Sequence, residues 1–470
     1  MKAALAIDIG TSSLKAALID VTGSVLAHAR VRFPHAKREV AHWTAAFDEA
    51  VTALARREPA LVSRNAISAI SISGNGPTLA AVRDAAFGPL LMWNEPEAGE
   101  QGPAASQQGA ASQQGAGEAH ARTRSLFIPR IELYRSRYPE HYEHARWLLS
   151  GPEALAYALA GEAITALPDP RYHDVYWSEE ELAAHGIDAS VLPPFAPASA
   201  VIGSCGRAPL EGVPVIVAGP DFLTALVGTG AVRPGLACDR AGTSEGLNLC
   251  MADRASHPLI RTLPAMIPNL WNASYVLPDT GARFHAWRES EGAGRAGARP
   301  REYDDIMREI AQSPIAPTGS AGECPGRAIV EDIGFSVRLG VDTLREAARF
   351  EGPYRLSGGQ ARNETWNRIK ADITGVSFEL TETADGELMG NAAIAFASLG
   401  EYASVAEAAT RMVRVVRSFE PDARNHALYS EKYASWLEAG CPAERAGRAA
   451  GRAAQRNAEH ADRRDDESAL

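Results

Sequence analysis

The chain has 470 residues and a mass of 50.0 kDa, which is too long for one ordinary hydrophobic core and predicts two domains of about 200 residues with a cleft between them. Apolar residues make up 46% and charged residues 22%, which argues against a mainly disordered or fibrous chain. The formal charge of −11 argues against a broad nucleic-acid surface, so an anionic ligand would depend on a metal ion or on backbone N–H groups.

Cysteine spacing and hydropathy limit the chemistry and the compartment. The five cysteines form no C-x-x-C pair, so neither a zinc site nor a disulfide framework is expected. The N-terminal apolar stretch is interrupted by Asp8, unlike a signal peptide, and no uncharged run of about 18 apolar residues follows. We therefore expect a cytoplasmic protein with no membrane and no nucleic-acid partner.

The first part of the chain has the pattern of an α/β protein. The first 30 residues read as short strands joined by the turns "IGTSS" and "VTGS". A helical pattern in "TAAFDEAVTALARRE" precedes the alternating strand "AISAISISG". Residues 99–121 are of low complexity, with "AASQQG" repeated directly, and predict a flexible insertion.

The rest of the chain repeats some of these features. "VPVIVAGPDFLTALVGTGAV" predicts a buried strand, a turn and a helix of small residues, and "CDRAGTSEGLNLC" predicts a second strand–turn–strand. A long amphipathic helix is expected in "GRAIVEDIGFSVRLGVDTLREAARF", a strand in "YRLSGG", and a capping box at Ser404 and Glu407. From about Gly440 the composition predicts a disordered or solvated tail.

Two of these turns carry residues suited to phosphoryl transfer from a nucleotide. In the first turn, Gly10 permits close backbone approach, Thr11 and Ser12 can donate to phosphate oxygens, and Asp8 is suited to orienting a hydrated Mg²⁺. Taken alone, however, a D-x-G turn between strands is common, and a plain structural turn stays open. Residues 242–246, "GTSEG", form a second hydroxyl-bearing glycine turn for the other side of a triphosphate, although Glu245 must then point outward or act through the metal.

Two further stretches fit the same chemistry. Asp221 follows a buried strand and precedes a helix, where it either caps that helix or accepts the proton of a hydroxyl that attacks the γ-phosphate. In "SGGQARNETWNRIKADITG", Gly358 and Gly359 leave room for a flat ring.

The order and spacing of these motifs resemble the FGGY family of carbohydrate kinases from residue 1 to about 437. The matching stretches include "IDIGTSSLKAALID", "ISISGNGPTLAAV", "LLMWNE", "AGTSEG", "LSGGQARNETWNRIKADITG" and "GELMGNAAIAFASLG". The resemblance implies an α/β fold with two ribonuclease H-like domains of the actin-like ATPase type flanking a nucleotide and sugar cleft. Residues 1–237 would bind sugar, 238–437 would bind nucleotide, and 438–470 would be a charged tail.

The resemblance also implies roles for individual residues. Asp221 would be the general base, Asp8 would partner Mg²⁺, and ATP would be the phosphate donor. The sugar would lie near Asn75 and Gly76 and near Trp93, Asn94 and Glu95, although Trp93 is equally compatible with core packing. The residues implied for ATP binding are Gly10, Thr11, Ser12, Ser13, Gly242, Thr243, Ser244, Gly358, Gly359 and Asn363.

Three departures from the family pattern bear on the substrate. "NGP" stands where many members have Met-His-Gly, and Asp169 has altered surroundings. Between "GTSEG" and "GRAIVEDIGF" the chain is shorter than usual, with Gly322, Glu323 and Pro325 as a remnant of a longer lid motif.

The expected function is ATP- and Mg²⁺-dependent phosphorylation of a small sugar or polyol, with a ketopentose such as xylulose or ribulose as the expected substrate. The alternative is a nucleotide- and sugar-binding protein of the same fold, with reduced or no kinase activity because of the shortened lid. A chaperone-like or actin-like ATPase is disfavoured by "SGGQARNETW". The oligomeric state stays open, and a homodimer is compatible with the sequence.

Overall fold

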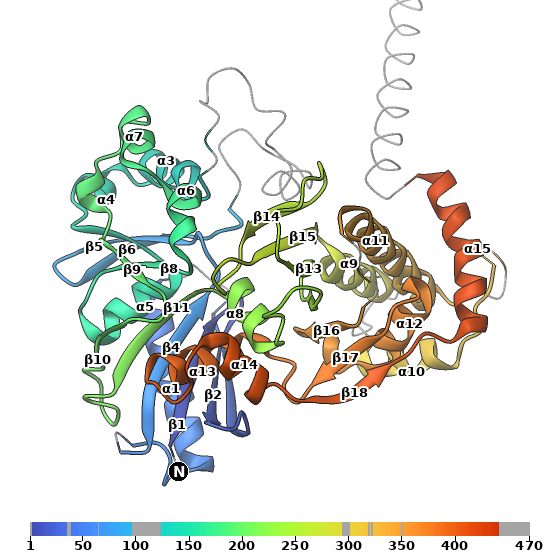
Figure 1. Cartoon of the computed structure of the whole chain (residues 1–470), viewed down its shortest axis with the longest axis horizontal. Helices are drawn as coiled ribbons and strands as arrows, with labels where there is room; N and C mark the ends of the chain where they lie inside the picture. Colours follow the sequence, from blue (N-terminus) through green and yellow to red (C-terminus); the bar gives the residue numbers. More distant parts are fainter. Residues whose placement is uncertain are drawn as a thin grey trace, which may run out of the picture. The chain divides into compact units, whose positions relative to one another are not determined.

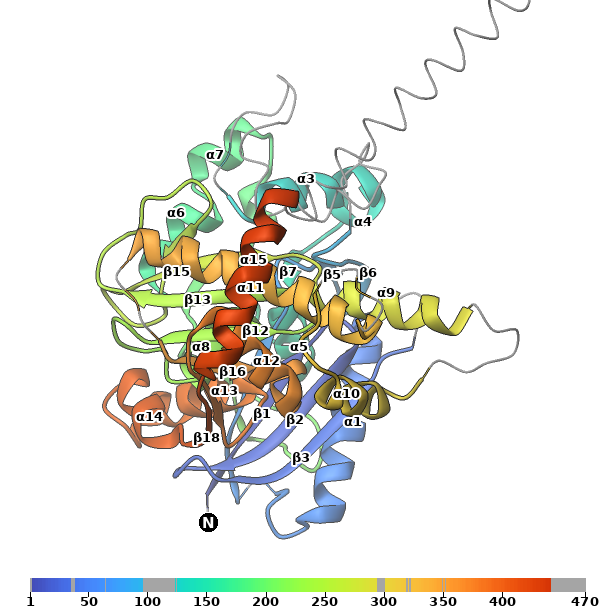
Figure 2. The same cartoon turned by 90° about the vertical axis from the view of Figure 1, so that its right-hand side faces the viewer.

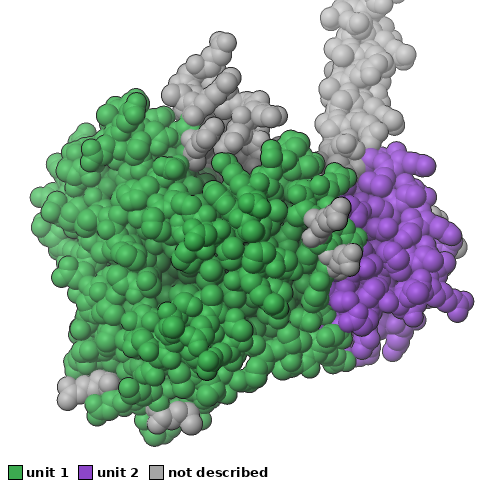
Figure 3. Space-filling model, in the orientation of Figure 1, with its two compact units in different colours: residues 1–282, 343–362, 378–418 green, residues 283–342, 363–377, 419–470 purple. Residues whose placement is uncertain are grey.

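The computed structural model describes residues 2–34, 39–63, 65–95, 123, 125–293, 301–317, 320, 323–348, 350 and 352–440. The predicted insertion at 99–121 and nearly all of the predicted tail lie outside the described residues. The chain divides into two compact units, shown in Figure 3. Unit 1 comprises residues 1–282, 343–362 and 378–418, and unit 2 comprises residues 283–342, 363–377 and 419–470.

Unit 1 is built on two mixed sheets whose central strands share one topology (Figure 1). In the first sheet β1 is antiparallel to β2 and parallel to β4, and β4 is parallel to β11. In the second sheet β12 is antiparallel to β13 and parallel to β16, and β16 is parallel to β17. Both predicted strand–turn–strand units are therefore confirmed, and each opens one sheet.

The strands follow in the order in which they lie in each sheet. The first sheet is β10 (Val201–Ser204), β11 (Pro214–Pro220), β4 (Ile67–Gly74), β1 (Ala3–Ile9), β2 (Ser13–Asp20) and β3 (Val25–Arg32). The second is β14 (Arg261–Pro264), β15 (Trp271–Leu277), β13 (Glu245–Met251), β12 (Ala237–Ala241), β16 (Tyr354–Ser357), β17 (Phe378–Thr381) and β18 (Val415–Phe419). Two small sheets consist of β6 (Ala86–Leu91), β5 (Leu79–Arg83) and β7 (Trp147–Ser150), and of β8 (Thr165–Leu167) and β9 (Phe195–Pro197).

The helices of unit 1 cover these sheets. They are α1 (Val40–Arg57), α3 (Ile128–Arg137), α4 (Pro139–Glu143), α5 (Gly151–Ala160), α6 (His173–Tyr176), α7 (Glu179–Ala184), α8 (Asp221–Gly228), α13 (Gly386–Ser398) and α14 (Val405–Met412), with short 3₁₀ turns η2 (Pro170–Tyr172), η3 (Ala189–Val191) and η4 (Gln360–Arg362). The Ser404 hydroxyl accepts the Glu407 N–H and caps α14, as predicted. Among the described helices, none is long and apolar enough to cross a bilayer.

The alternation of large and small residues in β1 places different helices on the two faces of the first sheet. Leu5 and Ile7 belong to a core shared with α1 and α5, whereas Ala4 and Ala6 belong to a core shared with α13 and α14. Because alanine is small, α13 packs close to the sheet and brings its first turn to the ends of β1 and β2.

Glycines allow equally close packing of α8 against α13. A Cβ atom on Gly390 would meet the Thr224 carbonyl oxygen at 1.9 Å, and one on Gly228 would meet the Gly386 carbonyl oxygen at 1.8 Å. Any side chain at these positions would push the helices apart. The first residue of α13 thus lies against the last residue of α8, and the next turn of α13 lies against Thr224.

Unit 2 is mainly helical (Figure 2). It contains most of α9 (Thr280–Ala293) and α11 (Pro325–Ala347), together with α10 (Tyr303–Gln312), α12 (Glu364–Thr374) and α15 (Ala423–Ala439). Its core includes Phe284, Ile310, Ile333, Trp366 and Tyr429. The long amphipathic helix predicted from the sequence is α11.

Candidate active site

The turns of the two sheets place opposite charges at equivalent positions. In the first hairpin Asp8 lies two residues before Gly10, and in the second Arg240 lies two residues before Gly242. In both turns the glycine N–H donates to a serine carbonyl, Gly10 to Ser13 at 3.0 Å and Gly242 to Ser244 at 2.8 Å. The second turn is one residue shorter than the first, and the position two residues before the glycine carries a carboxylate in one hairpin and a guanidinium in the other.

The parallel neighbour of each hairpin strengthens this correspondence. Asp8 pairs with Ser73 on β4, and Arg240 pairs with Ser357 on β16. A glycine follows each serine: Gly74 after Ser73, and Gly358 after Ser357. The two sheets thus present the same arrangement of strand ends, and the charged residue is what differs between them.

Five charged side chains join the two hairpins, and we call them the charge chain. Lys15 Nζ lies 3.3 Å from Asp8 Oδ2 and 3.6 Å from Glu387 Oε2. Arg240 Nε lies 3.0 Å from Glu387 Oε1, and Arg240 Nη2 lies 2.7 Å from Asp221 Oδ2. The charge chain thus connects Asp8, the predicted metal partner, to Asp221, the predicted base.

Asp385, the residue before α13, extends this network. Its Oδ1 lies 3.4 Å from Lys15 Nζ, and its Oδ2 lies 3.3 Å from His28 Nε2 and also accepts from Arg362. Asp385 therefore holds β2, β3 and the turn η4 together beside the charge chain.

Burial and neighbouring charges shift several pKa values in this network. Burial raises the pKa of Asp8 to about 7, although Lys15 partly opposes this. Burial would also raise the pKa of Glu387, but Lys15 and Arg240 lower it below its usual value. Burial would lower the pKa values of Lys15 and Arg240, yet the surrounding carboxylates raise both. The two cations and Glu387 are therefore charged, while Asp8 titrates near neutral pH.

In the first predicted phosphate loop the hydroxyl groups have different surroundings. Thr11 Oγ1 accepts from Asn75 Nδ2 and from Trp93 Nε1, each at 3.1 Å, so its own O–H remains available to donate. Ser12 is exposed, whereas Ser13 is buried and accepts from Arg30 Nε at 2.9 Å. Thr11 and Ser12 are thus better placed to meet a ligand than Ser13.

The predicted sugar segment is tied to this loop. The side chain of Trp93 is 41% exposed, so the core-packing interpretation is wrong for this residue. Asn94 is also exposed, whereas Glu95 accepts the Met92 N–H at 2.9 Å and pairs with Arg137. The Trp93 ring therefore stands at the protein surface beside Thr11 and Asn75.

Asp221 does not cap its helix. Pro220 occupies the N-cap position of α8, no side chain caps the helix there, and Asp221 is its first residue. The carboxylate bonds Arg240 instead, and its side chain is 14% exposed. The capping interpretation is therefore wrong, and the carboxylate remains available for chemistry.

Ala241, the residue before the second predicted loop, lies against Gly358, the first of the two glycines that follow β16. Gly358 has a φ of +93°, and a Cβ atom there would meet the Ala241 carbonyl oxygen at 2.2 Å, whereas a Cβ atom on Gly359 would meet nothing within 4 Å. Gly242 and Thr243 are exposed, but Glu245 is buried, so of the two alternatives for Glu245 the outward-pointing one is wrong. Asn363 belongs to unit 2, where it caps α12 by accepting the Trp366 N–H.

The carboxylates are compatible with Mg²⁺ that binds together with a nucleotide. No three metal-ligating side chains form a ready site among the described residues. Protein-bound Mg²⁺ commonly uses one or two carboxylates together with phosphate oxygens and water. Asp8 suits that role, and Glu387 Oε2 is buried without a hydrogen bond from any described residue.

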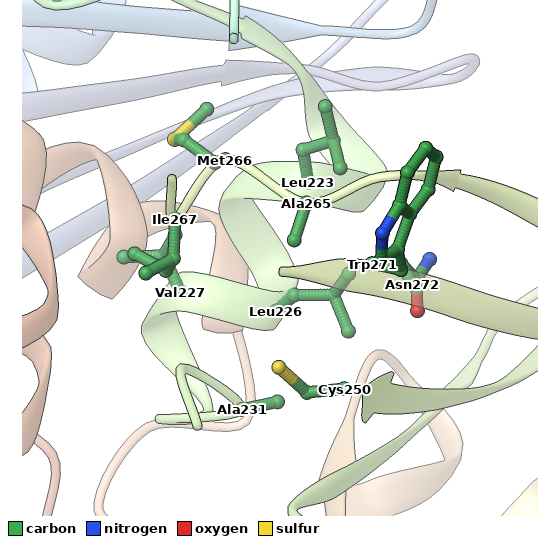
Figure 4. Close-up of a pocket in the computed structure, with 10 residues that line it drawn as sticks. All are labelled: Leu223, Leu226, Val227, Ala231, Cys250, Ala265, Met266, Ile267, Trp271 and Asn272. Atoms are coloured by element: carbon green, nitrogen blue, oxygen red, sulfur yellow. The ribbon is translucent and has the colours of Figure 1, made fainter. Parts of the chain in front are cut away.

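Two small cavities are separate from this network. The first, of about 10 Å³, is lined mostly by apolar side chains of α8 and the second sheet, with Cys250 and Asn272 among them (Figure 4). It has room for about one water molecule and none for a sugar. The second, of about 140 Å³, lies in unit 2 and is lined by Trp287 and Pro325, among others. Asp169 lies in neither and pairs with Arg171.

The sequence reasoning missed Lys15, Arg240, Asp385 and Glu387. All four lie inside or beside stretches that were recognised, "GTSSLK", "CDRAGTS" and "GELMGN", so their positions were visible but their partners were not. One signal in the sequence could have identified Arg240. It lies two residues before Gly242, just as Asp8 lies two residues before Gly10.

Comparisons with known proteins give the family of the chain and its fold. Residues 3–228 match the N-terminal domain of the FGGY family of carbohydrate kinases, and residues 304–399 match its C-terminal domain. The autoinducer-2 kinase of Escherichia coli (strain K12) is 24% identical over 364 residues, which are 66% of this chain and 68% of the relative. The xylulose kinase of Bacillus subtilis (strain 168) is 22% identical over 479 residues, which are 91% and 95% of the two chains.

Solved structures share the fold. A xyloylose kinase from Brucella ovis superposes with a TM-score of 0.71 at 21% identity, covering 94% of this chain and 99% of that one. A gluconate kinase from Lactobacillus acidophilus gives 0.71 at 16% identity, covering 93% and 97%. At such identities the likeness establishes the fold alone. The two domain matches, in chain order and over more than half of the 470 residues, show that the chain belongs to the FGGY family of carbohydrate kinases, ATP-using phosphotransferases.

Proposed function

We propose that this carbohydrate kinase uses Mg²⁺-ATP to phosphorylate a ketopentose such as xylulose or ribulose, with Asp221 as general base. The observation that carries the proposal is the charge chain, because it joins the predicted metal partner and the predicted base through Lys15, Glu387 and Arg240. A xylulose kinase that matches 91% of this chain supports the ketopentose.

In the proposed reaction Asp221 accepts the proton of a sugar hydroxyl while that oxygen attacks the γ-phosphorus of ATP in line. The bond from the γ-phosphorus to the bridging oxygen breaks, and ADP leaves. When bound with ATP, Mg²⁺ would neutralise phosphate charge, and Asp8 would hold it. The loops Gly10–Ser13 and Gly242–Ser244 would donate hydrogen bonds to the phosphate oxygens.

The sugar would bind within residues 1–237, near Asn75, Gly76, Trp93 and Asn94. The exposed ring of Trp93 offers an apolar face to the C–H groups of a sugar, and its N–H fixes Thr11. The nucleotide would bind within residues 238–437, with adenosine near Gly358, Gly359 and Asn363. Exclusion of water from the bound sugar would favour transfer over ATP hydrolysis.

The Asp221→Asn variant tests the assignment of the base. We expect turnover to fall by about 10²–10⁴-fold while ATP binding is unchanged, because the amide keeps the shape of the side chain but cannot accept the proton. The matched control is Asp48→Asn on α1, whose carboxylate also pairs with an arginine, Arg207. If Asp221→Asn phosphorylates sugar at the wild-type rate, Asp221 is not the base.

A panel of ketopentoses, hexuloses, glycerol and sugar acids, with ADP release as the readout, tests the substrate. Turnover restricted to ketopentoses supports the proposal, and turnover on another class replaces the substrate. Tight ATP binding without turnover on any member would instead favour a binding protein whose shortened lid has cost it kinase activity.

A further inference from the structure

Arg240 is the feature of the site that neither the turns nor the predicted residues explain. Its position corresponds to Asp8 in the other hairpin, and both strands pair in parallel with a serine at that position. In the first hairpin the carboxylate of Asp8 needs a cation from elsewhere, and Lys15 on the paired strand supplies one. In the second hairpin the cation is Arg240, which lies on β12 at the position that corresponds to Asp8.

The hydrogen bonds of Arg240 leave part of its guanidinium unused. Nε donates to Glu387 and Nη2 donates to Asp221, at 3.0 and 2.7 Å. No hydrogen bond from Nη1 to any described residue is present, and the side chain is 31% exposed. A planar guanidinium has five N–H donors in fixed directions, so two partners orient the group and leave donors over.

The position of Arg240 in the chain sets where those donors lie. The residue is separated by Ala241 alone from Gly242, the start of the second predicted phosphate loop. The same guanidinium bonds the predicted base, while the Arg240 backbone is two residues from the start of the loop where phosphate would bind. Glu387 fixes the guanidinium from the other side and is itself 2% exposed.

We propose that Arg240 is a catalytic arginine: it holds Asp221 toward the sugar hydroxyl and donates from its free N–H groups to the phosphoryl group in transfer. This inference rests on the proposed function. During transfer the sugar oxygen–phosphorus bond forms as the bond to ADP breaks, and the hydroxyl proton goes to Asp221. Arg240 exchanges no proton and forms no bond, and it stabilises the negative charge on the oxygens of the moving group.

The first test compares Arg240→Lys with the matched control Arg355→Lys. Arg355 lies on the adjacent strand β16, where it pairs with Glu379 and is 21% exposed, so the control also shortens a partly buried, ion-paired arginine. Lysine keeps the charge but cannot hold two carboxylates and a phosphoryl oxygen in fixed directions. We expect Arg240→Lys to lower kcat by about 10²–10³-fold, with the KM for ATP within about threefold of wild type, and Arg355→Lys to retain kcat.

The second test measures binding and needs no sugar. In the presence of Mg²⁺, we compare the affinity for ADP with the affinity for ADP plus aluminium fluoride, which imitates the phosphoryl group in transfer. We expect aluminium fluoride to increase ADP affinity for the wild type and for Arg355→Lys, and to increase it at least about tenfold less for Arg240→Lys and Arg240→Gln. Because each ratio comes from one preparation, incomplete folding of a variant does not affect it.

A third comparison separates a role through Asp221 from a direct role. If Arg240 only positions Asp221, adding Arg240→Lys to Asp221→Asn causes no further loss of the residual rate, whereas a direct contact with the phosphoryl group predicts a further loss of about tenfold or more. An unchanged aluminium fluoride ratio in Arg240→Lys overturns the proposal. If the wild type phosphorylates no sugar but the ratio falls in the variant, the proposed substrate fails and the assignment of Arg240 stands.

Discussion

The two glycine hairpins of unit 1 have the same strand pairing but differ in turn length and in charge. Each has a glycine turn with hydroxyl side chains, and each lies beside a serine–glycine pair on the parallel strand. Asp8 in the first hairpin is a buried carboxylate, while Arg240 in the second is a partly exposed cation. The comparison teaches that one pattern of strand pairing serves two electrostatic roles: the carboxylate of the first hairpin needs a cation as partner, and the second hairpin supplies a cation.

The largest effect on stability is expected from replacing Lys15, whose ammonium group is the cation beside Asp8 in the first hairpin. Its ammonium group is shared by Asp8, Asp385 and Glu387, so Lys15→Met leaves three carboxylates without this partner. We expect a loss of about 3 kcal/mol in the free energy of unfolding, measured with urea. Lys2→Met, which breaks an exposed pair with Glu401, should cost less than about 0.5 kcal/mol. Equal losses in both variants would show that the shared ammonium of Lys15 contributes no more to stability than an exposed ion pair.

The next prediction compares alanine substitutions at Gly74 and Gly358, the glycines that follow Ser73 and Ser357. Alanine at Gly358 would force a φ of +93° on a residue with a Cβ and would collide with the Ala241 carbonyl oxygen, so we expect a loss of at least about 2 kcal/mol. A Cβ on Gly74 would meet Ile9 at 3.2 Å, which a small shift relieves. Gly74→Ala should therefore cost less than Gly358→Ala in urea unfolding, and the reverse order would contradict the packing described for the second hairpin.

A smaller effect concerns pH and Asp8. Because burial raises the pKa of Asp8 to about 7, the folded protein holds this proton more tightly than the unfolded chain does. The stabilisation is complete below the unfolded pKa of about 4 and is lost as pH rises through about 7. The stability of the wild type relative to Asp8→Asn should therefore fall between about pH 5 and pH 8. A difference that is constant with pH would mean that Asp8 is charged throughout this range.

The smallest effect concerns Trp93 and the link between the sugar segment and the first loop. Trp93→Phe keeps a ring but removes the N–H that donates to Thr11 Oγ1. We expect a change of less than about 1 kcal/mol in unfolding free energy, with a rise in the KM for sugar. Trp147→Phe, on β7, is the control for the loss of an indole ring system. If the KM for sugar rises equally in both variants, the link to Thr11 carries no specificity.

Much of the fold could be predicted because it depends on local patterns. The apolar run of β1, the alternation in β4, the glycine turns and the apolar periodicity of α11 each reflect the geometry of one strand, turn or helix. The positions of Asp8 and Asp221 at strand ends followed from the same patterns, and the structure places both in one charge chain.

Side-chain partners could not be predicted because they depend on contacts between distant segments. Glu387 meets Lys15 and Arg240 across long stretches of sequence, and no local pattern records that meeting. The same holds for the burial of Glu245 and for the exposure of Trp93, because the sequence allowed both an outward and an inward orientation for each side chain.

The sequence by itself determined an α/β chain with two glycine turns, a carboxylate at the end of the first strand and a carboxylate at the start of a small-residue helix. Only the tertiary structure decided that these carboxylates are joined by two cations and Glu387. The physical reason is that the cost of burying a charge is offset only by partners in space. The close packing of α8 against α13 brings those partners together, and it depends on glycines far apart in the chain.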